Sequence, residues 1–86
     1  MNINELIAIV KNKLEMEIVI QDLKIEDKSF LHKNHKGNQE GMFHLKLIIK
    51  SEELKRLSKI ESTKKIYSIL NLELKEHIHS IQILLS

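Results

Sequence analysis

The chain has 86 residues, five His, no Cys and a formal net charge of +2, from 14 Lys and Arg against 12 Asp and Glu. This length predicts one domain over residues 1–86, because two domains would each be too small to bury a core unaided. Without Cys the chain forms no disulfide scaffold, zinc finger or redox dithiol, and none of its own thiolates can hold an iron–sulfur cluster.

The apolar runs are far shorter than the ~20 residues of a membrane span. The first residues, Met1–Glu5, lack the basic and apolar regions of a signal peptide. We therefore expect a cytosolic protein that does not enter a membrane.

A first helix is predicted to begin after Asn2. Asn2 can cap the helix, and Glu5 can reach back to the backbone of the capping residue. Apolar residues then recur at helical spacing and form one stripe: Ile3, Leu6, Ile7, Val10 and Leu14. The β-branched residues 18–20 fit either a strand or a packed connection.

The pattern changes to a period of two from Gln21 onward. Leu23 and Ile25 alternate with charged residues, which predicts a half-buried strand. Residues 28–41 are polar, rich in His and contain both glycines, so we expect a long hairpin loop. A second strand is predicted over residues 42–50, with Phe43, Leu45, Leu47 and Ile49 on one face.

Two helices and a last strand are predicted for the remaining residues. Ser51 caps a short helix, and Ser58 caps a longer one that runs from about Lys59 to Glu76. We expect Ile60, Tyr67, Leu70 and Leu74 to be buried, with Ile66 and Ile69 widening that stripe. In the last strand Ile81, Ile83 and Leu85 alternate with Ser80, Gln82 and Leu84.

The order of elements is helix, strand, strand, helix, helix, strand, which predicts an α+β fold. The first two strands pair antiparallel through the loop. The helices between the second and third strands form a crossover, so the last strand can lie parallel to one of the others. We expect a three-stranded mixed sheet with the helices packed on one face.

Four motifs in this order resemble the BolA-like family. Residues 27–37 are similar to its D-E-S-x-x-H-x-x-H-x-G loop, and residues 44–51 to its H-F-x-V-x-(I/V)-V-S strand and cap. Residues 67–74 resemble its helix end, and residues 78–81 its C-terminal I-H-A-L. The resemblance covers nearly the whole chain and implies a KH-like (class II) fold.

The resemblance also implies a non-enzymatic adaptor. Such a protein binds a monothiol glutaredoxin with glutathione and shares a bridging 2Fe–2S cluster, in iron–sulfur trafficking or iron-responsive regulation. By resemblance, His79 is a cluster ligand, and His32 or His35 is the second. The free chain is expected to carry no cofactor and to be a monomer.

The chemistry of the residues is compatible with this role. A chain without Cys can ligate such a cluster only through imidazole or carboxylate, and a partner must supply the thiolates. Only neutral imidazole has a lone pair to give, and the ordinary pKa of His is about 6.5, so affinity should fall below roughly pH 6.

Ordinary structural roles also fit the five His. His77 suits the last turn of a helix, where it complements the helix dipole, and His44 suits a structural hydrogen bond in a strand. His32 and His35 alone would be a weak metal signal on a loop. His79 shares strand parity with Ile81 and Ile83, which on its own predicts a partly buried, hydrogen-bonded residue.

The basic residues suggest an alternative function. Some bacterial members of the family are transcriptional regulators, and a DNA-binding surface resembling a helix-turn-helix would use Lys55, Arg56, Lys59, Lys64 and Lys65. The Arg-His pair of the family's central segment is replaced here by Ser62-Thr63. We favour a solvated helix face for these residues, because no aromatic or Asn/Gln set is placed to read bases, and phosphate contact without specificity is the remaining use.

Other functions find little support in the sequence. The chain has no Gly-rich phosphate loop, no Cys nucleophile and no Ser in a nucleophile elbow, so we expect no enzymatic activity. A plain protein–protein module without metal is the remaining alternative.

Overall fold

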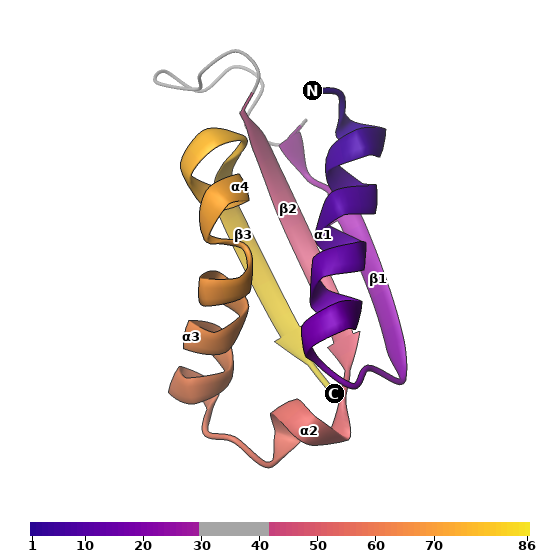
Figure 1. Cartoon of the computed structure of the whole chain (residues 1–86), viewed down its shortest axis with the longest axis vertical. Coiled ribbons are helices and arrows are strands. Elements are labelled where there is room, and N and C mark those ends of the chain that lie inside the picture. Colours follow the sequence, from indigo (N-terminus) through magenta and orange to yellow (C-terminus); the bar gives the residue numbers. More distant parts are fainter. Residues whose placement is uncertain (30–41) are drawn as a thin grey trace.

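The computed structural model describes residues 1–29 and 42–86. Its elements are α1 (Ile3–Glu17), β1 (Asp22–Asp27), β2 (Phe43–Lys50), α2 (Glu52–Lys55), α3 (Lys59–Ile69), α4 (Asn71–Glu76) and β3 (Ile78–Leu85) (Figure 1). In the sheet, β2 lies between β1, which is antiparallel to it, and β3, which is parallel to it. The predicted α+β class with a three-stranded mixed sheet is confirmed.

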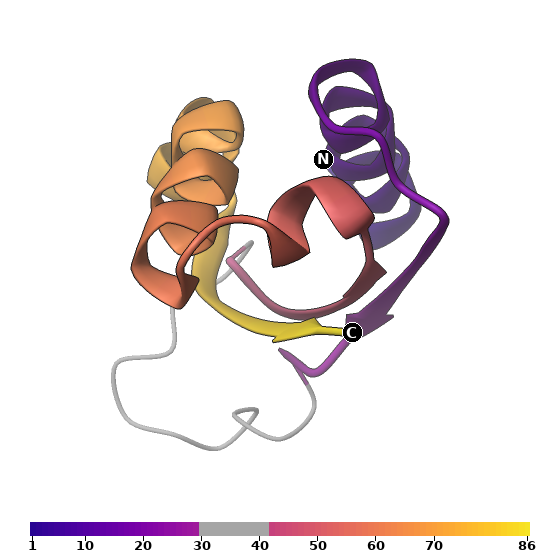
Figure 2. The same cartoon turned by 90° about the horizontal axis from the view of Figure 1, so that it is seen from below.

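The helices cover one face of the sheet. Figure 2 shows α1 and the α3–α4 pair side by side above the strands, with α2 closing the end where β2 finishes. The chain between β2 and β3 therefore forms the predicted crossover, and the opposite face of the sheet stays open among the described residues.

The N-terminus of α1 is capped as the sequence predicts. The Glu5 backbone N–H donates to Asn2 Oδ1 at 2.8 Å, and Asn2 Nδ2 donates to Glu5 Oε1 at 2.9 Å. Leu6, Val10 and Leu14 are buried along one stripe of the helix. Residues 18–20 form a connection and no strand, and Ile18 packs into the core.

The two predicted serine caps are confirmed. Ser51 Oγ accepts from the Leu54 N–H at 3.2 Å, which begins α2. Ser58 begins α3 with a capping box: its Oγ accepts from the Glu61 N–H at 3.1 Å, and its own N–H donates to Glu61 Oε1 at 3.3 Å. These caps divide the polar stretch after β2 into two helices.

The prediction of one helix from Lys59 to Glu76 is wrong in two respects. Leu70 (φ −97°, ψ 17°) interrupts the helix and separates α3 from α4. Ile60 and Tyr67, predicted to be buried, are 70% and 43% exposed. The face that meets the sheet instead carries residues at i, i+4, i+8 and i+11, namely Ser62, Ile66, Leu70 and Glu73.

The hydrogen bonding of Ser62 is compatible with its burial on this face of the helix. Its hydroxyl donates to the Lys59 carbonyl at 3.0 Å, so its polar group is satisfied inside its own helix. A short, satisfied side chain can therefore face the interior, whereas Ile60 is exposed.

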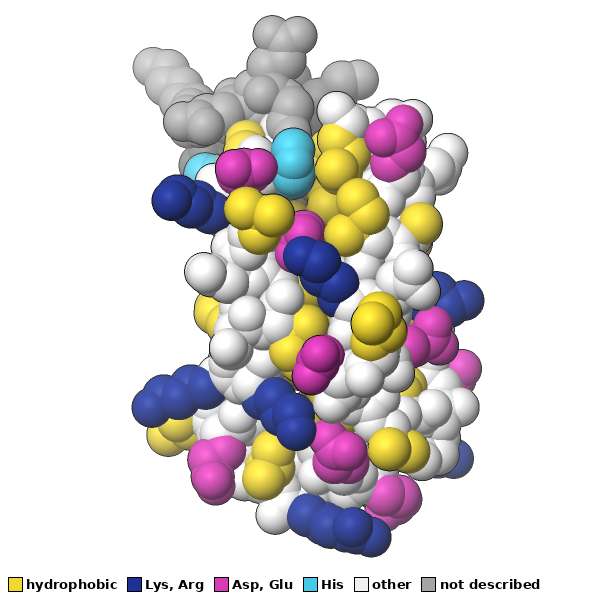
Figure 3. Space-filling model, viewed as in Figure 1, with side chains coloured by type: hydrophobic (Ala, Val, Ile, Leu, Met, Phe, Trp, Pro, Cys, Tyr) yellow, Lys and Arg dark blue, Asp and Glu magenta, His cyan; other side chains and the backbone are white. Residues whose placement is uncertain are grey.

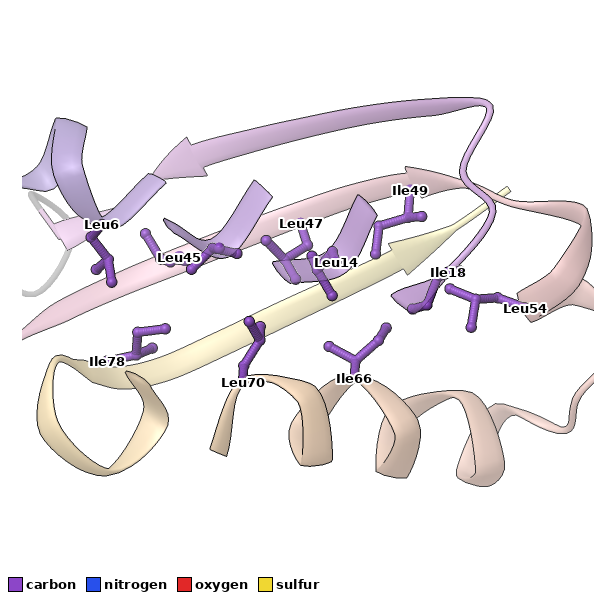
Figure 4. Close-up of a cluster of buried hydrophobic side chains, with 11 residues drawn as sticks. Leu6, Leu14, Ile18, Leu45, Leu47, Ile49, Leu54, Ile66, Leu70 and Ile78 are labelled. Atoms are coloured by element: carbon purple, nitrogen blue, oxygen red, sulfur yellow. The ribbon is translucent and has the colours of Figure 1, made fainter. Parts of the chain in front are cut away.

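The core lies between the sheet and the helices (Figure 4). Leu45, Leu47 and Ile49 alternate along β2 and are buried, as predicted. The remaining buried apolar residues come from the helices, the connection after α1 and the start of β3: Leu6, Val10, Leu14, Ile18, Leu54, Ile66, Leu70 and Ile78. Burial of such side chains is the main favourable contribution to folding.

Candidate functional site

The sheet topology brings distant segments together at one end of the sheet. The Phe43 N–H, at the start of β2, donates to the His77 carbonyl at 2.9 Å, just before β3. The Lys28 N–H, just after β1, donates to the His44 carbonyl at 2.7 Å. The described residues that flank the segment 30–41 therefore lie beside the start of β3.

His79 is the extra residue of a β-bulge. Phe43 pairs with Ile78 and His44 pairs with Ser80, so β3 advances two residues where β2 advances one. A bulge leaves its extra residue unpaired and redirects its side chain. Here it separates the buried Ile78 from the next inward-facing residue, Ile81, and leaves His79 exposed.

The parity prediction for His79 is therefore wrong. Strict alternation would place His79 with Ile81 and Ile83 and bury it in part. The bulge shifts the alternation by one residue, so that Ile78 takes the inward position and His79 is exposed. An imidazole in this position is accessible to an approaching molecule.

His44 lies directly beside His79. His44 is only 4% exposed, and its Nδ1 lies 2.6 Å from Ser80 Oγ. Its backbone N–H donates to Ser29 Oγ at 3.1 Å. The predicted structural hydrogen bond of His44 is confirmed. Its ring centroid lies 5.0 Å from that of His79, with 55° between the ring planes, a contact that sequence reasoning missed.

The outer face of the sheet is hollowed next to this pair. Lys28, Lys46, Ser80 and Gln82 line a depression of about 340 Å³ together with His44. Glu26 lies on the same face, with its carboxylate 3.5 Å from the ammonium groups of both Lys24 and Lys28. Burial raises the pKa of Glu26, but the two ammonium groups outweigh this effect and lower the pKa overall.

The other histidines separate into two groups. His77 caps the C-terminus of α4, and its Nε2 lies 3.9 Å from Glu76 Oε2, in keeping with its predicted place in the last turn. His32 and His35 lie outside the described residues, so their candidate role as ligands stays a prediction.

The described residues do not form a complete metal site. Across residues 1–29 and 42–86, no three His, Asp or Glu side chains gather so as to hold a metal ion. The chain also contains no Cys. A metal ion at His79 would therefore need ligands from outside the described residues.

The predicted basic residues lie at the opposite end of the sheet. Lys55 on α2, its C-cap Arg56, and Lys59 and Lys64 on α3 are exposed, whereas Lys65 Nζ lies 3.0 Å from Glu53 Oε2. The hydrogen bond from Lys65, aided by one from the Val19 N–H, lowers the pKa of Glu53. One of the five charges is therefore already paired.

The surroundings of these residues are mixed in character. On the face in Figure 3, basic and acidic side chains are interspersed and do not separate into patches of one sign. Between α2, α3 and the end of β3, Lys55 and Lys59 border a groove of about 400 Å³ whose apolar lining includes Leu57 and Leu84. The lining of this groove offers positive charge but no aromatic residue for base stacking, and the exposed aromatic on α3 is Tyr67, three residues after Lys64.

Comparison with known proteins shows the family. Residues 14–86 match the model of the family described as "BolA-like protein". The DNA-binding transcriptional regulator BolA of Haemophilus influenzae is 33% identical over 73 residues, which cover 85% of this chain and 68% of that protein. The chain belongs to the BolA-like family.

Two further similarities come from Arabidopsis thaliana. SufE-like protein 1, chloroplastic/mitochondrial, is 30% identical over 79 residues, which cover 86% of this chain but only 21% of that protein. The solved BolA domain of SufE1 superimposes with a TM-score of 0.78 at 28% identity, over 100% of this chain and 93% of that domain. The fold predicted from the sequence is that of a BolA domain.

None of the helices described here is long and apolar enough to cross a bilayer.

Proposed function

We propose that the chain is a non-enzymatic BolA-like adaptor. It binds a monothiol glutaredoxin with its glutathione and shares a bridging 2Fe–2S cluster through His79 and a loop histidine, His32 or His35. The observation that carries the proposal is the exposed His79, set on a bulge at the end of the sheet where the segment bearing the other two histidines begins and ends.

The donor set of this chain fits half of such a site. Two imidazoles on one iron and two thiolates on the other is a known arrangement of a 2Fe–2S cluster. The chain has no thiolate of its own, and its described residues form no complete metal site. A partner that brings two thiolates supplies what is missing, so the cluster is shared cargo of the complex.

In this scheme the residues of this chain contribute one cluster ligand and hold the neighbouring backbone in place. His79 donates a ring nitrogen, which must be deprotonated to act as a ligand. The backbone hydrogen bonds of Lys28 to His44 and of Phe43 to His77 hold the residues on either side of the segment 30–41 near His79. The free chain is a monomer in the cytoplasm without cofactor, and the complex passes or senses iron–sulfur clusters.

The test is reconstitution of the pure chain with a monothiol glutaredoxin, glutathione, iron and sulfide. Visible absorption and circular dichroism of the mixture should differ from the sum of the separate proteins. His79→Ala should abolish the new signal, and His77→Ala, at the adjacent helix end, should leave it. His32→Ala and His35→Ala, measured separately, identify the loop ligand. Additive spectra, or no effect of His79→Ala, would refute the proposal.

A second function rests on the relative in Haemophilus influenzae, whose name describes a DNA-binding transcriptional regulator. In this chain the same activity would use Lys55, Arg56, Lys59, Lys64 and Lys65, through phosphate contacts. DNA binding should then weaken steeply with salt and be reduced by Lys59→Glu and Lys64→Glu. If DNA binding is unchanged by both substitutions, a DNA-binding function through these residues is excluded.

A further inference from the structure

Because His79 is the extra residue of the bulge, strand pairing does not fix the orientation of its side chain. As the extra residue of the bulge, His79 has no pairing partner on β2, and an exposed side chain ordinarily samples several rotamers. Ordering such a side chain on binding costs conformational entropy. A ligand on a bulge therefore gains from a neighbour that holds its ring in place before the partner arrives.

The neighbour in this structure is His44. Its ring centroid lies 5.0 Å from that of His79 at an interplanar angle of 55°, within the range of stabilising aromatic contacts. His79 is exposed, whereas His44 is nearly completely buried. One ring of the contact is thus buried on the outer face of the sheet and hydrogen-bonded to Ser80, and the other ring is exposed to solvent.

His44 is itself held from two strands. Its backbone occupies β2, and its Nδ1 meets Ser80 Oγ on β3 at 2.6 Å. Ser80 follows His79 directly, so the hydrogen bond joins the residue after the bulge to the ring that packs against the bulge. The Ser29 hydroxyl accepts from the backbone N–H of His44 and holds the same residue from the side of β1.

We propose that His44 is a positioning residue for His79. Its buried ring, packed against the His79 ring, restricts the His79 imidazole to one orientation suited to an incoming iron–sulfur partner. This inference rests on the proposed function for the identity of the partner, but the restriction itself is a property of the free chain and can be measured there.

The first experiment uses the free chain labelled for NMR. Nuclear Overhauser contacts between the rings of residues 44 and 79, and three-bond couplings of a single χ1 rotamer at His79, are expected in the wild type. His44→Leu, which removes the ring, should give averaged couplings at His79. His44→Phe, which keeps a ring but not Nδ1, should retain the contacts. Averaged couplings in the folded wild type would overturn the proposal whether or not a cluster is ever bound.

The second experiment measures the glutaredoxin concentration that half-saturates the visible circular dichroism of the reconstituted complex. His44→Leu should raise it roughly three- to tenfold, the size of one aromatic contact, while His44→Phe stays within about threefold of wild type. Ile66→Val, a buried substitution on α3, controls for lost stability and should change neither readout. Equal effects of the Leu and Phe variants would overturn the role of the ring.

The two proposals fail in different ways. If His79→Ala leaves the complex unchanged, the proposed function fails, whereas the NMR couplings still decide whether His44 orients His79. If His79→Ala abolishes the complex and His44→Leu has no effect on couplings or affinity, only the positioning role is refuted.

Discussion

Lys13 Nζ lies 2.7 Å from Glu73 Oε2, and this ion pair joins α1 to α4 across the helical layer. The Glu73 side chain is only 5% exposed, and that of Lys13 is 37% exposed. The second carboxylate oxygen, Glu73 Oε1, is buried and has no hydrogen-bond partner among the described residues. Nearly all compensation of this buried carboxylate therefore depends on one lysine.

Removing Lys13 should destabilise the fold. Lys13→Ala leaves the buried Glu73 carboxylate without its cation, and because the Lys13 side chain is 37% exposed the loss should cost about 1–3 kcal/mol, less than for a fully buried pair. The free energy of unfolding, from urea titration followed by far-UV circular dichroism, should fall by about that amount. Lys11→Ala, at an exposed position of the same helix, is the control and should change it by less than about 0.5 kcal/mol.

Replacing both partners separates the cost of the unpaired charge from the value of the pair. The double variant Lys13→Met, Glu73→Leu puts apolar side chains of similar volume in place of the ions, and such exchanges are often neutral or stabilising. We expect it to regain most of the stability that Lys13→Ala loses. A double variant as unstable as the single one would show that the ion pair itself stabilises the packing of α1 on α4.

The sequence predicts the order of elements and the helix caps because both depend on local chemistry. Asn2, Ser51 and Ser58 each cap a helix through a neighbour three residues away. The buried face of α3 is different, because the spacing of apolar residues cannot show that Ser62 is buried and Ile60 exposed. Which of the two is buried depends on the path of the chain across the sheet and on the break at Leu70, which are tertiary properties.

The pair of Glu53 and Lys65 makes stability depend on pH. In the folded state, the hydrogen bonds from Lys65 and from the Val19 N–H lower the pKa of Glu53 below its ordinary value of 4.5. Since the folded carboxyl releases its proton more readily than the unfolded one, the contribution of Glu53 to stability is complete above about pH 4.5. It is lost as the pH falls through the lowered pKa.

The measurement is the difference in unfolding free energy between wild type and Glu53→Gln, taken at several pH values. The advantage of the wild type should be constant near neutrality and shrink below about pH 4.5. Glu52→Gln, one residue earlier and without an ion pair among the described residues, is the matched control for removing a carboxylate from α2. An advantage that grows on acidification would contradict the lowered pKa.

The capping box of α3 should be worth a measurable part of the stability. Ser58→Ala removes the acceptor of the Glu61 N–H and should lower the free energy of unfolding by about 1 kcal/mol, whereas Ser58→Gly should cost only a few tenths. Thermal and urea unfolding measure both. Ser68→Ala, an exposed change in the same helix, serves as the comparison, and an equal loss there would argue against a specific cap.

The candidate site shows where reasoning from sequence alone stops. The I-H-A-L resemblance singles out His79, but a period of two places that residue with Ile81 and Ile83 on the inner face. The bulge that exposes it is defined by pairing with Phe43 and His44, which lie more than thirty positions away in the sequence. A register shift of this kind leaves no periodic signal in the strand itself.

Deleting His79 should test whether the bulge serves the fold. Without it, Ile78 and Ser80 become adjacent and still pair with Phe43 and His44, so β3 alternates regularly and Ile81 keeps its inward position. The extra residue of a bulge is unpaired, and its loss removes no ladder hydrogen bond. We expect the free energy of unfolding of the deletion variant to lie within about 1 kcal/mol of the wild-type value.

The same deletion should remove any shared-cluster signal, because the imidazole is gone while the sheet remains. Deleting Gln82 instead is the matched control: it moves Ile83 and Leu85 out of their pairing with Leu47 and Ile49 and should cost several kcal/mol. Urea unfolding of the two deletion variants makes the comparison. If the loss of His79 were as damaging as the loss of Gln82, the bulge would be a requirement of folding, and its placement of an exposed histidine would follow from packing alone.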